Sequence, residues 1–437
     1  MDPDGIERLS ADDAAILALE SSALNGHTLK VILLEATDRP LDLDELRAEV
    51  AGRLGSQRRA TQRIEIGPDG NARWVDDEAF DIAAQIDRYA GPLADGGPGP
   101  ALWAIAASLM QRRLDHRRSL WHLDLVGPLA DGHEAIVARI HHAMADGISA
   151  MRLLGSILWT SDPNGTLHPA RTSDTTASST AVTGYDDELR RLPGALRREL
   201  LGGGSHTPLD QRIGSARSLA FSFLPLEDLR RIGHGRQPAA RVNDVLLAVV
   251  AGALNTWAPL ARERRTRVRA QIPVSLHVRR DGGDAAGLGN LESFLNVDLP
   301  IDEADPLVRI DRVRDQTTQR KQLDDAEELY DFFHAVSRLP RLASSIERLA
   351  SSPMEWSVSI SNVPGPSSPV SVLGRRVERL GTIAEPADHH ALRISAISSA
   401  DTLAVGLCTD PTVLPDIDRL AAATDVAFSQ LRDLVTQ

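Results

Sequence analysis

Two adjacent histidines, His141 and His142, are separated by three residues from Asp146 and Gly147 in the stretch RIHHAMADGIS, residues 139–149. A neutral imidazole, with an unperturbed pKa of about 6.5, can take a proton from a hydroxyl, amine or thiol near neutral pH. The pattern therefore predicts a general base, provided that a neighbour fixes the tautomer of the ring. The alternative is structural: two satisfied polar residues at a strand end, followed by a turn before a helix.

No metal site is expected at this pair. Side chains alternate along a strand, so the two rings should point to opposite faces and cannot share an ion. No His-x-x-x-His or carboxylate–histidine spacing supplies a third ligand near the pair. The sequence also lacks the Gly-x-Ser-x-Gly elbow of serine hydrolases, so direct transfer without a covalent intermediate is the simpler chemistry.

The segments around the histidines predict a strand, a loop and a helix in succession. Residues 134–140 have the pattern of a strand paired with 121–126, and 148–158 have helical periodicity. Such corners commonly carry chemistry in α/β proteins. A further strand at 29–36 and helices at 44–53 and 101–114 complete an alternation that predicts a mixed α/β fold.

The chain is expected to form two domains. Residues 161–207 are rich in Ser, Thr, Gly and Pro and are predicted to be a linker or crossover between domains at 1–160 and 208–437. In the second domain, Asn243 is expected to cap a helix over 244–257, and Ser361 and Asn362 should precede a stiff loop made by VPGP. Further strands at 267–276 and 293–300 and a final amphipathic helix at 415–435 are expected.

Composition narrows the class of protein. The net charge of −13 argues against a nucleic-acid binder, because phosphate contacts need clustered cations. The single cysteine, Cys408, excludes an internal disulfide and is expected to be a small core residue. The first residues do not resemble a secretory signal, and no apolar run approaches a membrane span, so a cytoplasmic location is expected.

Motifs that match those of one known family occur along nearly the whole chain. HHAMADG has the spacing His-His-x-x-x-Asp-Gly, and the other segments are LSADDA, WVDDEAFDI, LDHRRSLW, VNDVLLAVVAGAL, PVSLH, GN (289–290) and SNVPGP. In this order they resemble the wax ester synthase/diacylglycerol acyltransferase branch of the acyl-CoA-dependent acyltransferase superfamily. Condensation domains and plant acyltransferases share related forms of the His-His-x-x-x-Asp-Gly signature. The Asn-Asp pair at 243–244 and SNVPGP are the most specific of these for the branch.

This resemblance implies an O-acyltransferase that moves a long-chain acyl group from acyl-CoA to the hydroxyl of diacylglycerol or a long-chain alcohol. It implies two chloramphenicol-acetyltransferase-like domains with mixed sheets and an active-site tunnel at their interface. Acyl-CoA would be the donor substrate, with no permanently bound cofactor and no metal.

Roles for individual residues also follow from the resemblance. His142 would be the general base, His141 a supporting residue, and Asp146 would hold the loop through an arginine that the sequence does not identify. Gly147 would leave room for the reacting groups, although an ordinary turn glycine is equally compatible. Three side chains are candidates to donate a hydrogen bond to the oxyanion: Asn243, Ser361 and Asn362. Asn243 has the helix cap as its structural alternative.

Some residues depart from the family pattern. Gln85 stands where the family often has His, and His116 and Ser119 stand where Arg and Pro are usual. Because they lie outside the central motif, they bear on acceptor preference more than on reaction type. A second pair, His389 and His390, lacks the Asp-Gly spacing and is expected to be structural or exposed.

Two other functions fit the same residues. One is a condensation-type enzyme whose acyl donor is bound to a carrier protein, which the lack of an attached carrier or adenylation segment disfavours. The other is a lipid-binding protein of the same fold without turnover. The basic and apolar stretch at 190–200 is a candidate for peripheral contact with a membrane or lipid droplet, and a solvated connector is its structural alternative.

Overall fold

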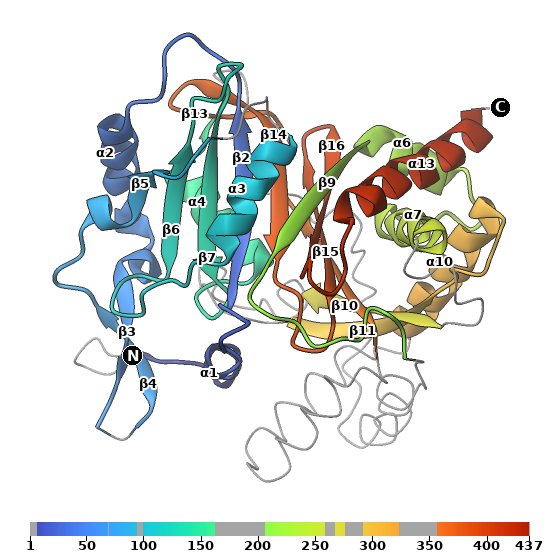
Figure 1. Ribbon diagram of the computed structural model, residues 1–437, viewed down its shortest axis with the longest axis horizontal. Helices are drawn as coiled ribbons and strands as arrows, with labels where there is room; N and C mark the ends of the chain where they lie inside the picture. Colours follow the sequence, from blue (N-terminus) through green and yellow to red (C-terminus); the bar gives the residue numbers. More distant parts are fainter. Residues whose placement is uncertain are drawn as a thin grey trace.

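Two large β-sheets lie side by side in the computed structural model, with helices packed against their faces (Figure 1). The structure describes residues 7–68, 70–93, 99–161, 206–257, 267–275, 292–322 and 356–436. A small sheet of β1 (Glu7–Arg8), β4 (Ala72–Asp76) and β3 (Gln62–Ile66) extends from the first large sheet. The predicted mixed α/β fold is confirmed.

The first large sheet carries the histidine corner. In the described part of the chain its strand order is β5-β6-β7-β2-β14-β13-β8. The bounds are β5 (Ile86–Arg88), β6 (Trp121–Val126), β7 (Glu134–His141), β2 (His27–Leu34), β14 (Arg375–Ala384), β13 (Val370–Val372) and β8 (Thr160–Ser161). The predicted antiparallel pairing of 121–126 with 134–140 is confirmed, and β7 pairs on its other side with β2.

β7 is an interior strand of this sheet, and both of its faces are apolar. Ile136 and Ile140 pack with the helices α2 (Leu43–Arg53) and α4 (Gly147–Ile157). Val137, on the other face, packs with α3 (Pro100–Met110). A strand that is covered on both sides gives a continuous apolar run rather than an alternating pattern, as in EAIVARI.

The second large sheet has the order β11-β10-β12-β15-β16-β9 in the described residues. The bounds are β11 (Glu292–Leu299), β10 (Val268–Ser275), β12 (Val358–Pro364), β15 (Leu392–Ser399), β16 (Thr402–Thr409) and β9 (Ser218–Pro225). On β16, Leu403, Val405 and Leu407 face a layer of helices, and Ala404 and Cys408 face the first sheet. The sheet therefore separates this helical layer from the first sheet.

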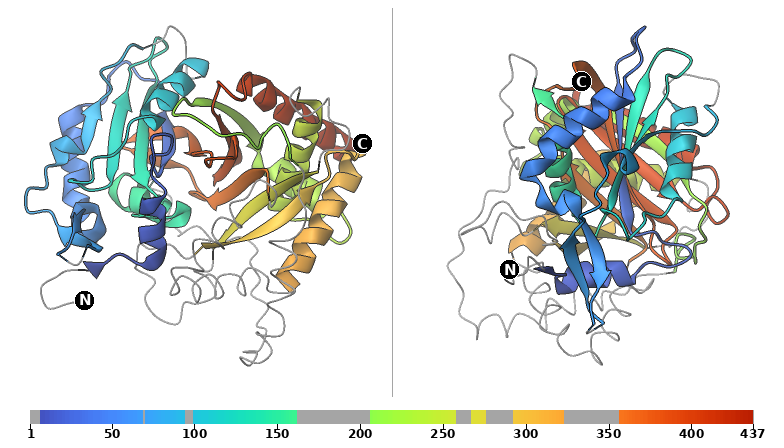
Figure 2. Two further views of the ribbon diagram at one scale, coloured as in Figure 1. Left: turned by 60° about the horizontal axis from the view of Figure 1, so that its bottom comes forward. Right: turned by 90° about the vertical axis from the view of Figure 1, so that its left-hand side faces the viewer.

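The helical layer consists of α6 (Leu226–His234), α7 (Val242–Thr256), α10 (Pro306–Gln322) and α13 (Ile417–Thr436), as the left view in Figure 2 and the contacts of α7 show. The predicted final helix is confirmed as α13. Within the described residues no helix is long and apolar enough to cross a membrane. Cys408 is buried, and burial raises the pKa of its thiol to about 12, as expected for a core residue.

The two halves of the chain share the first sheet. Strands β13 and β14, from residues 370–384, sit between β2 and β8, which come from residues 27–161. β14 also packs across β15 and β16 of the second sheet. The division into 1–160, 161–207 and 208–437 stays a prediction, and residues 162–205 lie outside the described part of the chain.

Candidate active site

The predicted strand, loop and helix meet at the two histidines. β7 ends at His141, the chain turns through His142 to Met144, and α4 begins at Gly147. The N–H groups of Met144 and Ala145 close the turn by donating to the His141 carbonyl at 3.0 and 3.2 Å. His141 is fully buried and His142 is half-buried. Because the strand ends between the two rings, strand alternation does not determine where His142 points.

The ring of His141 has a defined tautomer. Its Nδ1 accepts a hydrogen bond from the backbone N–H of Ala143 at 3.1 Å. Its Nε2 lies 2.8 Å from Oε1 of Glu20, and an ionised carboxylate can only accept. The proton is therefore on Nε2. Burial lowers the pKa of His141, so the neutral ring is favoured.

Glu20 gathers three donors around one carboxylate. Nε2 of His116 lies 2.7 Å from its Oε1, and Nη1 of Arg113 lies 2.9 Å from its Oε2. Burial alone would raise the pKa of Glu20, but the hydrogen bonds from His116 and His141 and their charges lower it to about 2. Glu20 is consequently a carboxylate at every pH at which the protein would work.

The same three side chains have the composition of a metal cluster. The ligand atoms of Glu20, His116 and His141 lie within 4.8 Å of one another. However, Nε2 of each histidine donates its proton to the carboxylate and so has no lone pair left for an ion. The arrangement is a hydrogen-bonded cluster, and the prediction of no metal stands as a prediction.

Asp146 and Gly147 start α4 and join it to the second sheet. The Asp146 carboxylate caps the helix by accepting from the N–H of Ser149 at 2.7 Å. A Cβ at Gly147 would lie 2.7 Å from Cγ2 of Val363 on β12. The glycine is therefore explained by the close approach of α4 and β12. That Asp146 binds an arginine stays a prediction.

Ser361 and Asn362 lie on the strand that makes this approach. β12 continues through Pro364, so the expected loop begins only at Gly365, and Ser361 and Asn362 lie within the strand. Residues 359–364 pair in parallel with β15. Its pairing with β10 extends only to Ser359, so β12 diverges from β10 before the motif begins. Ser361 is half-buried and Asn362 is exposed. The structure thus brings SNVPGP beside the start of α4.

Asn243 lies elsewhere, in the helical layer. The expected cap is wrong, because the helix begins two residues earlier, at Val242, and Arg241 is the N-cap residue. The carboxylate of Asp244 accepts from the backbone N–H of Arg241 at 2.8 Å and from Oγ1 of Thr317 on α10 at 2.7 Å. Asp244 therefore holds α7 against α10. No described hydrogen bond joins Asn243 to the histidine corner.

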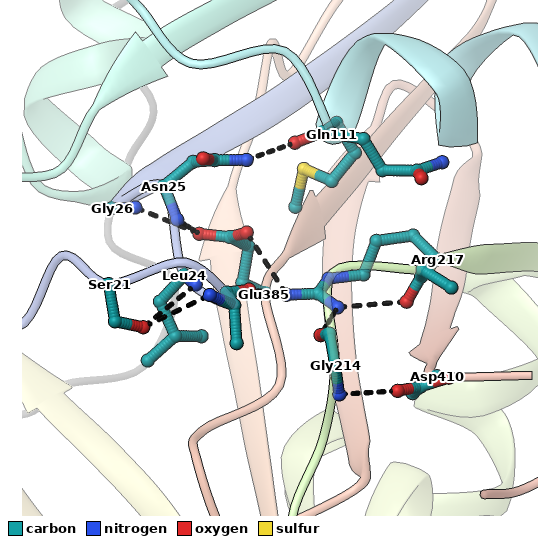
Figure 3. A network of polar contacts seen from close by, with 12 residues as sticks. Ser21, Leu24, Asn25, Gly26, Gln111, Gly214, Arg217, Glu385 and Asp410 are labelled. Atoms are coloured by element: carbon teal, nitrogen blue, oxygen red, sulfur yellow. Dashed lines mark hydrogen bonds and ion pairs between the residues drawn. The ribbon is translucent and has the colours of Figure 1, made fainter. Parts of the chain in front are cut away.

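The backbone of His142 is tied to the segment that precedes β2. Its N–H donates to the carbonyl of Gly26 at 2.8 Å. Gly26 has φ +71°, and a Cβ there would lie 2.5 Å from Nε2 of His141, so the position needs glycine. Figure 3 shows Oε2 of Glu385 accepting from the N–H groups of Asn25 and Gly26, both at 2.9 Å, with Arg217 beside it. Burial raises the pKa of Glu385, and Arg217 opposes this.

The residues that depart from the family pattern lie close together. Nε2 of Gln85 donates to the carbonyls of Ser119 and Trp121, at 3.0 and 2.6 Å. His116 lies on the same loop and binds Glu20. These residues therefore stabilise the loop that carries His116 to the Glu20 carboxylate, which His141 also contacts.

The second histidine pair is divided between core and surface. His390 is buried and its ring stacks on Trp356, with the ring centroids 3.4 Å apart. The side chain of His389 is half exposed, and its Nε2 lies 3.3 Å from the Asp388 carboxylate. These positions agree with the expectation that the pair is structural or exposed.

Comparison with known families shows to which family the chain belongs. A model described as the wax ester synthase/diacylglycerol acyltransferase catalytic domain matches residues 9–202, and the C-terminal domain of the same family matches residues 288–432. The chain belongs to this family. The resemblance inferred from the motifs is thereby confirmed.

Curated relatives cover most of the chain. The Mycobacterium tuberculosis protein named "Probable diacyglycerol O-acyltransferase tgs1" is 28% identical over 468 residues, covering 98% of this chain and 96% of the relative. A second protein of that organism, also named a diacyglycerol O-acyltransferase, is 30% identical over 410 residues, covering 84% of this chain and 77% of the relative.

Solved structures show the same fold. The wax ester synthase/diacylglycerol acyltransferase from Marinobacter aquaeolei VT8 has a TM-score of 0.73 and 21% identity, covering 99% of this chain and 100% of that one. The first condensation domain of the CDA synthetase has a TM-score of 0.61 at 14% identity, with 99% and 96% covered. The expected two-domain architecture with mixed sheets is confirmed.

Three residues around the site were not found from the sequence: Glu20, His27 and Glu385. Asn25 and Gly26 form a recognisable turn signal before β2, and this signal could have marked the segment. It gives no indication that Glu20 meets a histidine 121 residues later in the chain.

His27 should make the stability of the protein depend on pH. It is buried and lies opposite His141 in the β2–β7 ladder. Burial, and next the charge of Arg139, lowers its pKa to about 3 from 6.5. As pH falls, His27 is therefore protonated in the unfolded chain before it is protonated in the folded protein. The contribution of neutral His27 to the free energy of unfolding is complete above pH 6.5 and is lost toward pH 3. It amounts to about 2 kcal/mol less stability at about pH 5 than at about pH 8.

Denaturant unfolding of the wild type and of His27→Asn at both pH values would measure this contribution. The difference in stability between the two pH values should be smaller in the variant by that amount, while other titrating groups cancel in the comparison. Equal pH dependence in the two proteins would contradict the assignment of a neutral, buried His27.

Proposed function

We propose that this chain transfers a long-chain acyl group from acyl-CoA to the hydroxyl of diacylglycerol, a long-chain alcohol or both, with His142 as general base. The family assignment supports acyl transfer. The observation that carries the role of His142 is its position: a half-buried imidazole beside a fully buried one, in a turn where α4 meets β12 of the other sheet. A base for acyl transfer needs access to substrate and a fixed geometry, and this corner offers both.

The proposed reaction has one tetrahedral intermediate. The neutral ring of His142 takes the hydroxyl proton as the acceptor oxygen bonds to the thioester carbonyl carbon. The intermediate then collapses, the carbon–sulfur bond breaks, and the CoA thiolate leaves with the proton from the His142 imidazolium. The charge on His142 exists only between these two steps, and His141 stays neutral throughout.

The negative oxygen of the intermediate needs donors. Losing such a donor typically costs about 3 kcal/mol of transition-state stabilisation. Ser361 is the preferred candidate, because it is half-buried on the strand whose Val363 contacts Gly147. Asn362, one residue along, is exposed. Asn243 is the weakest of the three, because its helix lies beyond the second sheet.

The proposal also covers which residues influence the choice of acceptor and where in the cell the reaction takes place. Gln85, His116 and Ser119 support the loop behind His141, so we assign to them an influence on acceptor choice rather than on chemistry. Peripheral contact with a membrane or droplet from the cytoplasmic side is proposed because both acceptors are poorly soluble in water. The stretch 190–200, suggested for that contact, lies outside the described residues.

Purified protein given palmitoyl-CoA and either dipalmitoylglycerol or hexadecanol tests the function. We expect release of free CoA thiol that depends on the acceptor, with the matching triacylglycerol or wax ester as product. The two rates rank the acceptors. Folded protein that releases thiol with neither acceptor would contradict the proposal and favour a carrier-bound donor or a lipid-binding role without turnover.

A further inference from the structure

The two peptide groups that flank His142 are both tied to one segment, Glu20 to Gly26. On one side, the N–H of His142 donates to the carbonyl of Gly26. On the other side, the N–H of Ala143 donates to Nδ1 of His141, whose Nε2 binds Glu20. The segment is called the brace here. It connects α1 (Ala11–Ala18) to β2.

Each end of the brace is held by one carboxylate. At the first end, the carboxylate of Glu20 accepts hydrogen bonds from the side chains of His141, His116 and Arg113. At the second end, Glu385 directly follows β14. Its carboxylate accepts hydrogen bonds from the backbone N–H groups of Asn25 and Gly26. The side chains of Glu20 and Glu385 are each only 7% exposed, so neither carboxylate can exchange these donors freely for water.

The second end also joins the two sheets. Arg217 directly precedes β9, and its guanidinium donates to Glu385 and to the carbonyls of Ala23 and Gly214. The N–H of Gly214 donates in turn to Asp410 at the end of β16, at 2.6 Å (Figure 3). The brace is therefore fixed against strands of the second sheet, although it supports a turn of the first.

We propose that Glu20 and Glu385 are positioning residues for the acyl transfer, holding the brace so that His142 has one orientation toward the substrates. This inference rests on the proposed role of His142. Glu20 acts through the tautomer of His141, and Glu385 acts through the Gly26 carbonyl. Neither touches substrate.

Replacing either glutamate by glutamine disrupts the hydrogen bonds that its carboxylate accepts, with little change in the size of the side chain. One amide oxygen replaces two carboxylate oxygens, and the amide nitrogen must face a donor whichever way it turns. In Glu20→Gln that donor is Arg113 or a histidine, and in Glu385→Gln it is Arg217 or the backbone N–H groups. A displacement of a reacting group by about 1 Å can cost about 10²-fold in rate.

We therefore expect each variant to lower kcat by about 10- to 100-fold with palmitoyl-CoA and the better acceptor, while KM changes less than about 3-fold. Histidine ¹⁵N NMR should show His141 protonated only at Nε2 in the wild type and a mixture of tautomers in Glu20→Gln. The signal is assigned by its loss in His141→Gln.

Glu378→Gln is the matched control, because Glu378 also accepts from a histidine Nε2, that of His133, at 3.1 Å, but on the surface. It should leave kcat and the His141 spectrum unchanged. Folded Glu20→Gln and Glu385→Gln proteins with wild-type kcat and an unchanged His141 signal would overturn the proposal, even if their stability fell. If the wild type itself transfers no acyl group, the proposed function fails, and the NMR comparison still decides whether Glu20 sets the tautomer.

Discussion

His142→Ala should lower kcat for acyl transfer by about 10²–10⁴-fold in protein that remains folded. Removing the ring removes the only proposed acceptor for the hydroxyl proton, so the alcohol must attack as a much weaker nucleophile. The fold should survive, because His142 is half-buried and its backbone bond to Gly26 does not involve the side chain. Acceptor-dependent thiol release, measured with palmitoyl-CoA, is the appropriate readout.

The chain offers a control for this substitution. His389 is also the exposed member of an adjacent histidine pair, and His389→Ala should leave kcat unchanged because its described contact is with Asp388 at the surface. His141→Ala is a poorer control, since it breaks the bond to Glu20 in a fully buried position. If His142→Ala kept the wild-type rate, another group would have to take the proton, and the proposed mechanism would be abandoned.

The histidine corner could be predicted because its signals are local. The apolar run before His141 gives β7, and the periodicity after Gly147 gives α4, so the chain must turn between them. The Asp146 cap follows the ordinary preference of helix N-termini. These are contacts between residues a few positions apart, where sequence and geometry are directly linked.

Long-range partners could not be predicted in the same way. Glu20 and Glu385 reach the corner from 121 and more than 200 residues away, and nothing in their own neighbourhoods distinguishes them from surface carboxylates. The cap expected at Asn243 failed for a different reason: a neighbouring acid, Asp244, closes the helix start by accepting from Arg241. The extension of β12 through Pro364 was missed because prolines usually end strands.

The sharing of strands between the halves is the largest feature that the sequence did not indicate. β13 and β14 follow SNVPGP in the chain but complete the sheet that carries His141. The corner is thus supported by the second half twice: through β12 against Gly147, and through Glu385 at the end of β14. A base whose position depends on both halves cannot be assembled by the first 160 residues alone.

Glu134→Ala should destabilise the protein by about 3–5 kcal/mol, because it leaves a buried arginine without its partner. Glu134 begins β7 and is fully buried. It accepts from the N–H of Leu41 at 2.7 Å, from Arg88 at 3.0 Å, and from Arg375 at the start of β14. Denaturant unfolding at neutral pH, followed by circular dichroism, should show the loss as a lower midpoint.

Two comparisons identify the cause of that loss. Glu65→Gln removes the exposed pair of Glu65 and Arg63 and should cost less than about 1 kcal/mol. Glu134→Leu combined with Arg375→Met removes both buried charges and should recover part of the stability that Glu134→Ala loses. The Arg88 side chain, which also loses Glu134, is 35% exposed and can be solvated. A midpoint for Glu134→Ala equal to that of Glu65→Gln would contradict the assignment. Since Arg375 belongs to the second half of the chain, recovery in the double variant would also show that the side chains of Glu134 on β7 and Arg375 on β14 are energetically coupled, in the sheet that presents His142.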